Sequence, residues 1–153
     1  MILGFHHTAI ATTDLSTMVD FYLTHLGFEL VVEQSWPSGS ERHDALTGLR
    51  DSSARYAVLR LGNAFLELFQ YLSPTPAPNN PERPVSDAGL THIAIVVDDI
   101  EAEFTQMRQA GVRFHCPPGP DGPYRATYGR DPEGNVFELI EISDPAHPFA
   151  LRP

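Results

Sequence analysis

Two stretches of the chain carry the same pattern: FHHTAIATTDLSTMVDFYLTHLG at residues 5–27 and LTHIAIVVDDIEAEFTQMRQAG at residues 90–111. Each begins with alternating apolar and β-branched residues, which is typical of a strand. A helical run follows, with an aspartate before it and a glycine after it. These are Asp14 and Gly27 in the first stretch and Asp99 and Gly111 in the second. Because aspartate and glycine favour the two ends of a helix, we predict a strand and a helix in each stretch.

Working outward, three strand-like runs follow each predicted helix. They lie at residues 28–33, 55–61 and 64–71 in the first half and at 112–115, 125–130 and 136–142 in the second. Each half therefore reads β-α-β-β-β, and an internal repeat of this size predicts an α+β chain of two equivalent modules.

The rest of the chain connects or extends these modules. The modules span residues 1–72 and 89–143, a proline-rich linker spans 73–88, and a tail spans 144–153. The long segment 35–53 has no clear periodicity, which favours an irregular functional loop or lid.

Composition excludes several kinds of function. The chain has 153 residues, and its ten basic side chains are all arginine against twenty acidic ones, for a net charge of −10. Without lysine there is no Schiff-base chemistry, no anchor for pyridoxal phosphate and no phosphate-binding P-loop. The acidic balance argues against nucleic acid and anionic membranes as partners. The single Cys116 and the lack of a long apolar run favour a cytoplasmic protein.

Two histidines and two glutamates occupy matched positions of the repeat. Side chains alternate between the faces of a strand, so His7 and His92 each share a face with an alanine two residues later. In the last strand of each module, Glu67 and Glu138 lie in the middle of an otherwise apolar face. A buried carboxylate is costly unless its charge is compensated. A divalent metal ion is a natural shared compensation for both.

Two imidazoles and two carboxylates form a mixed nitrogen and oxygen ligand set. Such a set suits Zn²⁺, Ni²⁺, Co²⁺, Mn²⁺ or Fe²⁺. A lone histidine or glutamate in a strand is usually structural or solvated, but four residues at matched positions favour one divalent metal ion as the cofactor.

The sequence resembles the vicinal oxygen chelate superfamily, which includes glyoxalase I, methylmalonyl-CoA epimerase and the extradiol dioxygenases. The resemblance extends from residue 3 to residue 142 and is carried by three motifs. These are His7-Thr8-Ala9-Ile10, His92-Ile93-Ala94-Ile95 and Asp131-Pro132-Glu133-Gly134-Asn135 leading to Glu138. The resemblance implies paired βαβββ modules whose sheets curl into a cup around one metal ion, with His7, Glu67, His92 and Glu138 at the metal positions of the glyoxalase I and epimerase branches.

The family's chemistry leaves three hypotheses. The first is an isomerase, epimerase or lyase that chelates neighbouring substrate oxygens and proceeds through an enolate-type intermediate, with Glu67 and Glu138 as catalytic proton carriers. The second is an Fe²⁺ extradiol dioxygenase, which needs only His7, His92 and Glu138. The third is a non-catalytic binding or resistance protein. The additional carboxylate, Glu67, favours the first hypothesis.

Neither named enzyme of the first hypothesis fits fully. The strand at residues 55–61 lacks the additional acidic residue of the epimerase branch, and no arginine set matches the glutathione-binding residues of glyoxalase I. The sequence therefore leaves the small-molecule substrate open.

Further residues are candidates for the substrate pocket. In the long loop, Trp36, His43 and Asp44 could close the pocket, and His43 is the best additional acid or base because imidazole titrates near neutrality. With no lysine, an anionic substrate group would need arginine, a bidentate fork. The remaining candidates are Arg55, Arg60, Tyr124, Arg125, Tyr128 and Arg130. The family also suggests a homodimer, and the length of the linker favours a metal site within one chain.

Overall fold

Both predicted strand–helix pairs form, and the expected aspartates cap the helices. Strand β1 (His7–Ala11) leads into helix α1 (Leu15–Leu26), whose first turn is capped by Asp14, which accepts a hydrogen bond from the Thr17 backbone N–H at 3.1 Å. In the second half, strand β5 (Ile93–Val97) leads into helix α3 (Ile100–Gln109), and Asp99 accepts from the Ala102 backbone N–H at 3.0 Å. The two helix starts are therefore built in the same way.

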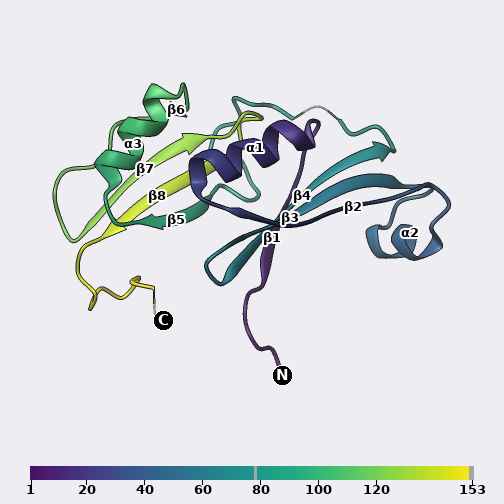
Figure 1. The fold of residues 1–153 in the computed structure, drawn as a ribbon, viewed down its shortest axis with the longest axis horizontal. Coiled ribbons are helices and arrows are strands. Elements are labelled where there is room, and N and C mark those ends of the chain that lie inside the picture. The colour runs from purple at the N-terminus through teal and green to yellow at the C-terminus, as the bar shows by residue number, and fades with distance from the viewer. Residues whose placement is uncertain (78, 152–153) are drawn as a thin grey trace. The chain divides into compact units, whose positions relative to one another are not determined.

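The computed structural model describes residues 1–77 and 79–151 (Figure 1). These form two compact units, Met1–Asn79 and Asn80–Pro153. Residue 78 of the predicted linker and residues 152–153 of the predicted tail lie outside the described residues. In the described part of the chain, no helix is both long enough and apolar enough to cross a membrane.

Each unit contains a four-stranded mixed sheet. In the first unit the order is β1-β4-β3-β2, with β1 parallel to β4 and the other pairs antiparallel. In the second unit the order is β5-β8-β7-β6, again with one parallel pair, β5 and β8. The other strands are β2 (Glu29–Trp36), β3 (Ser53–Leu61), β4 (Ala64–Ser73), β6 (Arg113–Phe114), β7 (Tyr124–Arg130) and β8 (Val136–Ile142). The predicted α+β class is confirmed.

One face of each sheet packs against a helix. In the first unit, α1 buries residues at helical spacing, including Leu15, Met18 and Tyr22, against the face that carries Leu66 and Leu68 of β4. In the second unit, α3 packs on β8, where Phe137 and Leu139 are fully buried. Since side chains alternate along a strand, Glu67 and Glu138 lie on the face away from the helix.

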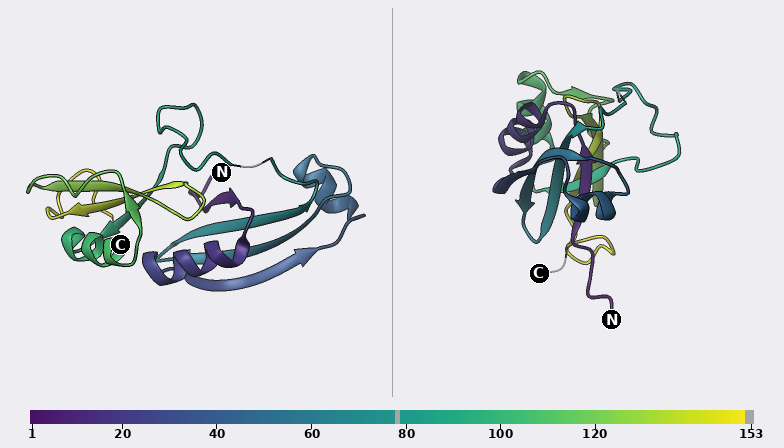
Figure 2. Two further views of the ribbon diagram at one scale, coloured as in Figure 1. Left: turned by 90° about the horizontal axis from the view of Figure 1, so that it is seen from above. Right: turned by 90° about the vertical axis from the view of Figure 1, so that its right-hand side faces the viewer.

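The segment from residue 35 to residue 53 differs from the prediction of an irregular loop. Strand β2 continues to Trp36, and helix α2 (Glu41–Thr47) forms beyond the carboxyl end of β2 (Figures 1 and 2). The helix ends at Gly48, whose φ of 71° is the left-handed cap conformation. Two turns are too short for hydrophobic periodicity to be visible, and none of the α2 residues is buried.

Candidate metal centre

In the first unit, strand register brings His7 and Glu67 together. Strand β1 is parallel to β4, and Ala9 lies opposite Glu67. His7 precedes Ala9 by two residues and therefore projects from the same face. Its Nε2 lies 3.6 Å from Glu67 Oε2, and the two side chains are 41% and 23% exposed.

The second unit repeats this arrangement. Strand β5 is parallel to β8, and Ala94 lies opposite Glu138. His92 immediately precedes β5, and its Nε2 lies 3.1 Å from Glu138 Oε2, with side-chain exposures of 27% and 10%. The same register in two modules gives the same histidine–carboxylate pair, with its nitrogen and oxygen turned toward each other.

In both pairs the other ring nitrogen of the histidine has its own partner. His7 Nδ1 lies 2.9 Å from His6 Nδ1, and His92 Nδ1 lies 2.9 Å from Thr91 Oγ1. A hydrogen bond at Nδ1 fixes the orientation of an imidazole and leaves Nε2 as the ligating atom. Each histidine therefore presents Nε2 toward its glutamate.

Among the described residues, Glu138 has a hydrogen-bond partner in addition to its histidine, and Glu67 has none. Tyr124 on β7 donates from its hydroxyl to Glu138 Oε1 at 3.1 Å, while Oε2 faces His92. Tyr128 lies directly opposite Glu138, and its ring centroid is 4.8 Å from that of His92. Burial raises the pKa of Tyr124, as does its bond to the carboxylate, so this phenol stays a proton donor. Glu138 is thus the firmly held carboxylate and Glu67 the freer one.

The donor atoms of each pair fit a divalent ion. Two ligands bound at about 2.0–2.2 Å to one ion lie about 3.0–3.5 Å apart, depending on the angle between them. The distance from His92 to Glu138 falls in this range and the distance from His7 to Glu67 is close to it. Within residues 1–77 and 79–151, no group of three or more histidine, cysteine or acidic side chains is gathered closely enough to hold a metal ion. Each unit by itself therefore carries one histidine–glutamate pair, His7 with Glu67 in the first and His92 with Glu138 in the second.

The structure places His43 and Trp36 away from Glu67, at the other end of the first sheet. Trp36 ends β2, opposite Ala54, and its ring stacks on that of His43 at 4.6 Å between centroids. His43 Nδ1 lies 2.6 Å from Ser40 Oγ. Trp36 lies close to Tyr71, which is four residues beyond Glu67, or about 13 Å along the strand. His43 is therefore not brought to the His7–Glu67 pair.

Asp44 supports Trp36. Its Oδ1 accepts hydrogen bonds from the backbone N–H and the hydroxyl of Ser52, at 2.8 and 2.6 Å. Ser52 Oγ in turn accepts from Trp36 Nε1 at 3.2 Å. These hydrogen bonds to Ser52 hold the pKa of Asp44 below its usual value. The Asp44 carboxylate thus has a structural role, because it connects α2 to Ser52 and, through Ser52, to Trp36.

Two of the candidate arginines lie on the helix-covered faces. Arg55 donates to Gln70 at 2.6 Å, and both side chains are on the face opposite to Glu67. Arg125 forms an ion pair with Glu101 of α3, also on the face away from Glu138. The structure therefore does not bring Arg55 and Arg125 to the two histidine–glutamate pairs.

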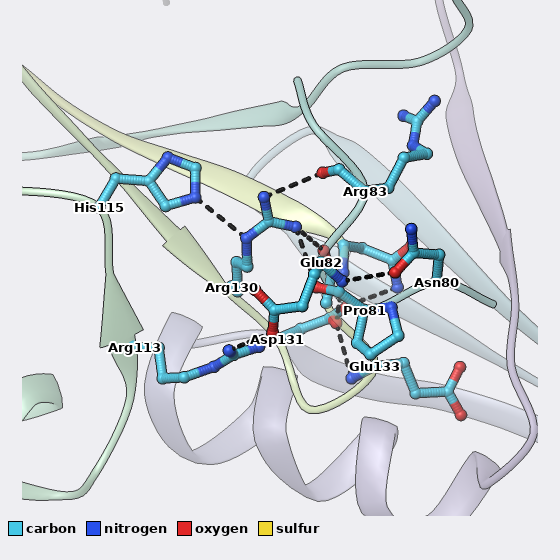
Figure 3. A network of polar contacts seen from close by, with 11 residues as sticks. Asn80, Pro81, Glu82, Arg83, Arg113, His115, Arg130, Asp131 and Glu133 are labelled. Atoms are coloured by element: carbon cyan, nitrogen blue, oxygen red, sulfur yellow. Dashed lines mark hydrogen bonds and ion pairs between the residues drawn. The ribbon is translucent and has the colours of Figure 1, made fainter. Parts of the chain in front are cut away.

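Arg130 holds residues 81–83, the part of the linker that belongs to the second unit, against strand β7 (Figure 3). Its Nη1 donates to the Pro81 and Gly134 carbonyl oxygens at 3.1 and 2.8 Å, and its Nη2 donates to the Arg83 carbonyl at 3.0 Å. Its Nε donates to His115 Nε2 at 3.0 Å. All three nitrogens of this guanidinium thus have protein partners. Of the other candidates, Trp36 and Arg60 lie on the face that carries Glu67, and Tyr124 and Tyr128 lie on the face that carries Glu138. Arg60 forms an ion pair with Glu29 at 2.7 Å.

Sequence reasoning missed two of these supports. The bond from Tyr124 to Glu138 follows from strand parity, because Tyr124 and Tyr128 share the Glu138 face, and parity could have found it. The attachment of the linker by Arg130 had no sequence signal, because it uses backbone carbonyl groups that any residue carries.

A family model, two curated proteins and a solved structure all relate this chain to glyoxalase-type proteins or to proteins of similar sequence. The model of the glyoxalase/bleomycin resistance protein/dioxygenase superfamily matches residues 4–139. The chain is 32% identical to the uncharacterized protein YaeR of Escherichia coli over 139 residues, covering 89% of this chain and 94% of that protein. It is 30% identical to a probable lactoylglutathione lyase of Synechocystis, covering 90% and 94%. A glyoxalase family protein from Bacillus cereus shares the fold, with a TM-score of 0.83, 21% identity and coverage of 93% and 95%.

Proposed function

We propose that this chain, which belongs to the glyoxalase/bleomycin resistance protein/dioxygenase superfamily, is a divalent-metal-dependent lyase or isomerase of the glyoxalase type. Its substrate would be a small molecule that chelates the ion through neighbouring oxygens. The observation that carries the proposal is the repeated register that sets His7 against Glu67 and His92 against Glu138. A glyoxalase-type role also agrees with the similarity to a probable lactoylglutathione lyase.

In this function His7, Glu67, His92 and Glu138 would be the ligands of the ion. A bound divalent ion polarises a substrate carbonyl and stabilises negative charge on its oxygen. The histidines bind through Nε2, since their Nδ1 atoms face His6 and Thr91. Glu138 is the fixed ligand because Tyr124 anchors its second oxygen.

Glu67 is the residue that moves the proton. It is more exposed than Glu138, and its separation from its histidine is longer, 3.6 Å against 3.1 Å. A carboxylate that can leave its partner can take a proton from the carbon beside a carbonyl and return it to the neighbouring carbon. These steps isomerise the substrate without a redox cofactor or an amine, which suits a chain with no lysine.

A chelation experiment tests this function. Purified protein is stripped with a chelator, reloaded separately with Zn²⁺, Ni²⁺, Co²⁺, Mn²⁺ or Fe²⁺, and assayed for isomerisation of the hemithioacetal of methylglyoxal and glutathione. We expect the stripped protein to be inactive and at least one ion to restore turnover. A protein that binds none of these ions, or that remains fully active when stripped, contradicts the proposal. A protein that binds an ion but does not act on this hemithioacetal is not a lactoylglutathione lyase. Oxygen uptake with a catechol by the iron form would instead indicate a dioxygenase.

A further inference from the structure

Four aromatic side chains lie together on the Glu67 face of the first sheet. We call this group the aromatic face, and it consists of Trp36, Tyr56, Phe69 and Tyr71. The rings of Tyr56 and Phe69 stack at 5.1 Å and 17°, and those of Phe69 and Tyr71 at 6.2 Å and 23°. Trp36 lies within 5.9–6.2 Å of the other three rings.

The aromatic face begins beside Glu67. Phe69 is the next residue of β4 on the same face, about 7 Å further along the strand. Tyr56 lies opposite Phe69 on β3, and Ala11 lies opposite Phe69 on β1. On the β1 side, the neighbour of Phe69 in the aromatic face is therefore the small side chain of Ala11. Phe65 and Phe69 flank Glu67 on this face, and the row of rings continues beyond Phe69.

The far end of the aromatic face is held rigid. Trp36 is 6% exposed, is bonded through Nε1 to Ser52, and stacks on His43 of α2. Tyr56 donates its hydroxyl to Gln34 at 2.6 Å. Tyr56, Phe69 and Tyr71 remain only half-buried, so their rings are partly accessible.

The four side chains of the aromatic face carry no formal charge, which makes it suited to a planar, uncharged group. Aromatic rings prefer centroid separations of about 4.5–7 Å in offset or edge arrangements, and the rings here already adopt such spacings among themselves. By contrast, the corresponding positions beside Glu138 hold Ile140, Ile142 and Ala126, so the second unit has no equivalent row. The aromatic row is therefore not a general feature of the repeat and is specific to the first unit.

From this placement we propose that the substrate carries an aromatic group, which stacks on the aromatic face while its neighbouring oxygens lie at the His7–Glu67 pair. This inference rests on the proposed function for the position of the oxygens. Each ring contact of this kind strengthens binding by about two- to twelvefold. With contacts to both Phe69 and Tyr56 at the middle of this range, an aromatic substituent should bind about tenfold tighter or more than a methyl group on the same chelating unit.

Two hydroxamates test the inference. Benzohydroxamate and acetohydroxamate have the same two chelating oxygens and differ only in a phenyl or a methyl group. Their affinities for the Zn²⁺-loaded protein are measured by calorimetry. The fluorescence of Trp36, the single tryptophan of the chain, reports on contact with the aromatic face. We expect benzohydroxamate to bind at least tenfold tighter and to be the only one of the two that changes the tryptophan emission.

Matched variants separate stacking from chelation. Phe69→Leu should reduce the ratio of the two affinities to about threefold or less and leave the affinity for acetohydroxamate unchanged. Phe65→Leu, the same substitution on the other side of Glu67, should leave the ratio unchanged. If either variant fails to fold, the comparison of the two ligands on the unmodified protein still tests the inference.

The outcomes distinguish this inference from the proposed function. If both hydroxamates bind in a metal-dependent way with equal affinity and Trp36 does not respond, the aromatic inference is wrong while the metal site stands. If neither binds the Zn²⁺-loaded protein, the proposed function fails and the inference fails with it.

Discussion

Replacing Glu67 or Glu138 by glutamine should have different effects, although the two residues are equivalent in the repeat. Glutamine keeps the size of the side chain and removes its charge and its ability to take a proton. We expect Glu67→Gln to abolish most of the turnover while the protein still binds its ion at saturating metal, with a smaller loss of affinity than in Glu138→Gln. We expect Glu138→Gln to lose the ion itself.

The size of each effect follows from the surroundings of the two carboxylates. A positioned general base contributes about 10²–10⁴-fold to the rate, so kcat of Glu67→Gln should fall by that factor. Glu138 has a side chain only 10% exposed, lies 3.1 Å from His92 Nε2 and accepts a hydrogen bond from the Tyr124 hydroxyl. Altering an interaction that orients a metal ligand costs about 10–100-fold in metal affinity, and changing the ligand itself should cost at least as much.

The assay combines metal content from mass spectrometry with the initial rate of hemithioacetal isomerisation at saturating metal. Glu33→Gln is the control, because Glu33 is an exposed strand glutamate of the same sheet and should change neither quantity. A Glu67→Gln protein with kcat within threefold of the unmodified protein would refute the assignment of the proton carrier. Equal metal loss in both variants would contradict the distinction between a freer and a fixed carboxylate.

Three further predictions concern the supports around the site. Tyr124→Phe removes the hydrogen bond to Glu138 and should weaken metal binding by about 10–100-fold without unfolding the chain. Competition with a chromophoric chelator measures the affinity, and an unchanged value would contradict the role of Tyr124 in holding Glu138. Gly134→Ala should lower the free energy of unfolding by about 1–3 kcal/mol, because Gly134 has a φ of 85° and a Cβ there would collide with the Pro81 backbone. Thermal unfolding measures this loss. An unchanged Tm would contradict the close packing of Pro81 against Gly134. The pKa of Asp44 is lowered in the folded protein, so its contribution to stability is present above about pH 4 and is lost as the pH falls below that value. The emission of the single tryptophan should therefore change below about pH 4, and a transition of the same size in Asp44→Asn would rule out this carboxylate as the cause.

The sequence was sufficient to predict the α+β fold and the matched positions of the two histidines and two glutamates in the repeat, because both depend on simple periodicities. Alternation along strands places His7 with Glu67 and His92 with Glu138 once the strands are in register. The capping aspartates mark where each helix starts, and the repeat supplies the same information twice.

What the sequence left open depends on contacts that have no periodicity. Helix α2 is too short and too exposed to leave a pattern, so its segment was predicted to be irregular. The candidate arginines looked equivalent in the sequence, but Arg55 and Arg125 lie on the helix-covered faces and Arg130 is bonded to linker carbonyl groups. Strand parity separates Arg55 from Arg60, whereas the partners of Arg130 come from a part of the chain without regular structure.

The central claim is that the four residues His7, Glu67, His92 and Glu138 form one metal site. Calorimetric titration of the stripped protein with Zn²⁺ tests it most directly, together with titrations of His7→Ala and His92→Ala. We predict one ion per chain with high affinity, and a large loss of affinity in both variants, although the two histidines come from different units. Binding that survives either substitution unchanged, or a stoichiometry of two equal ions per chain, would contradict the account.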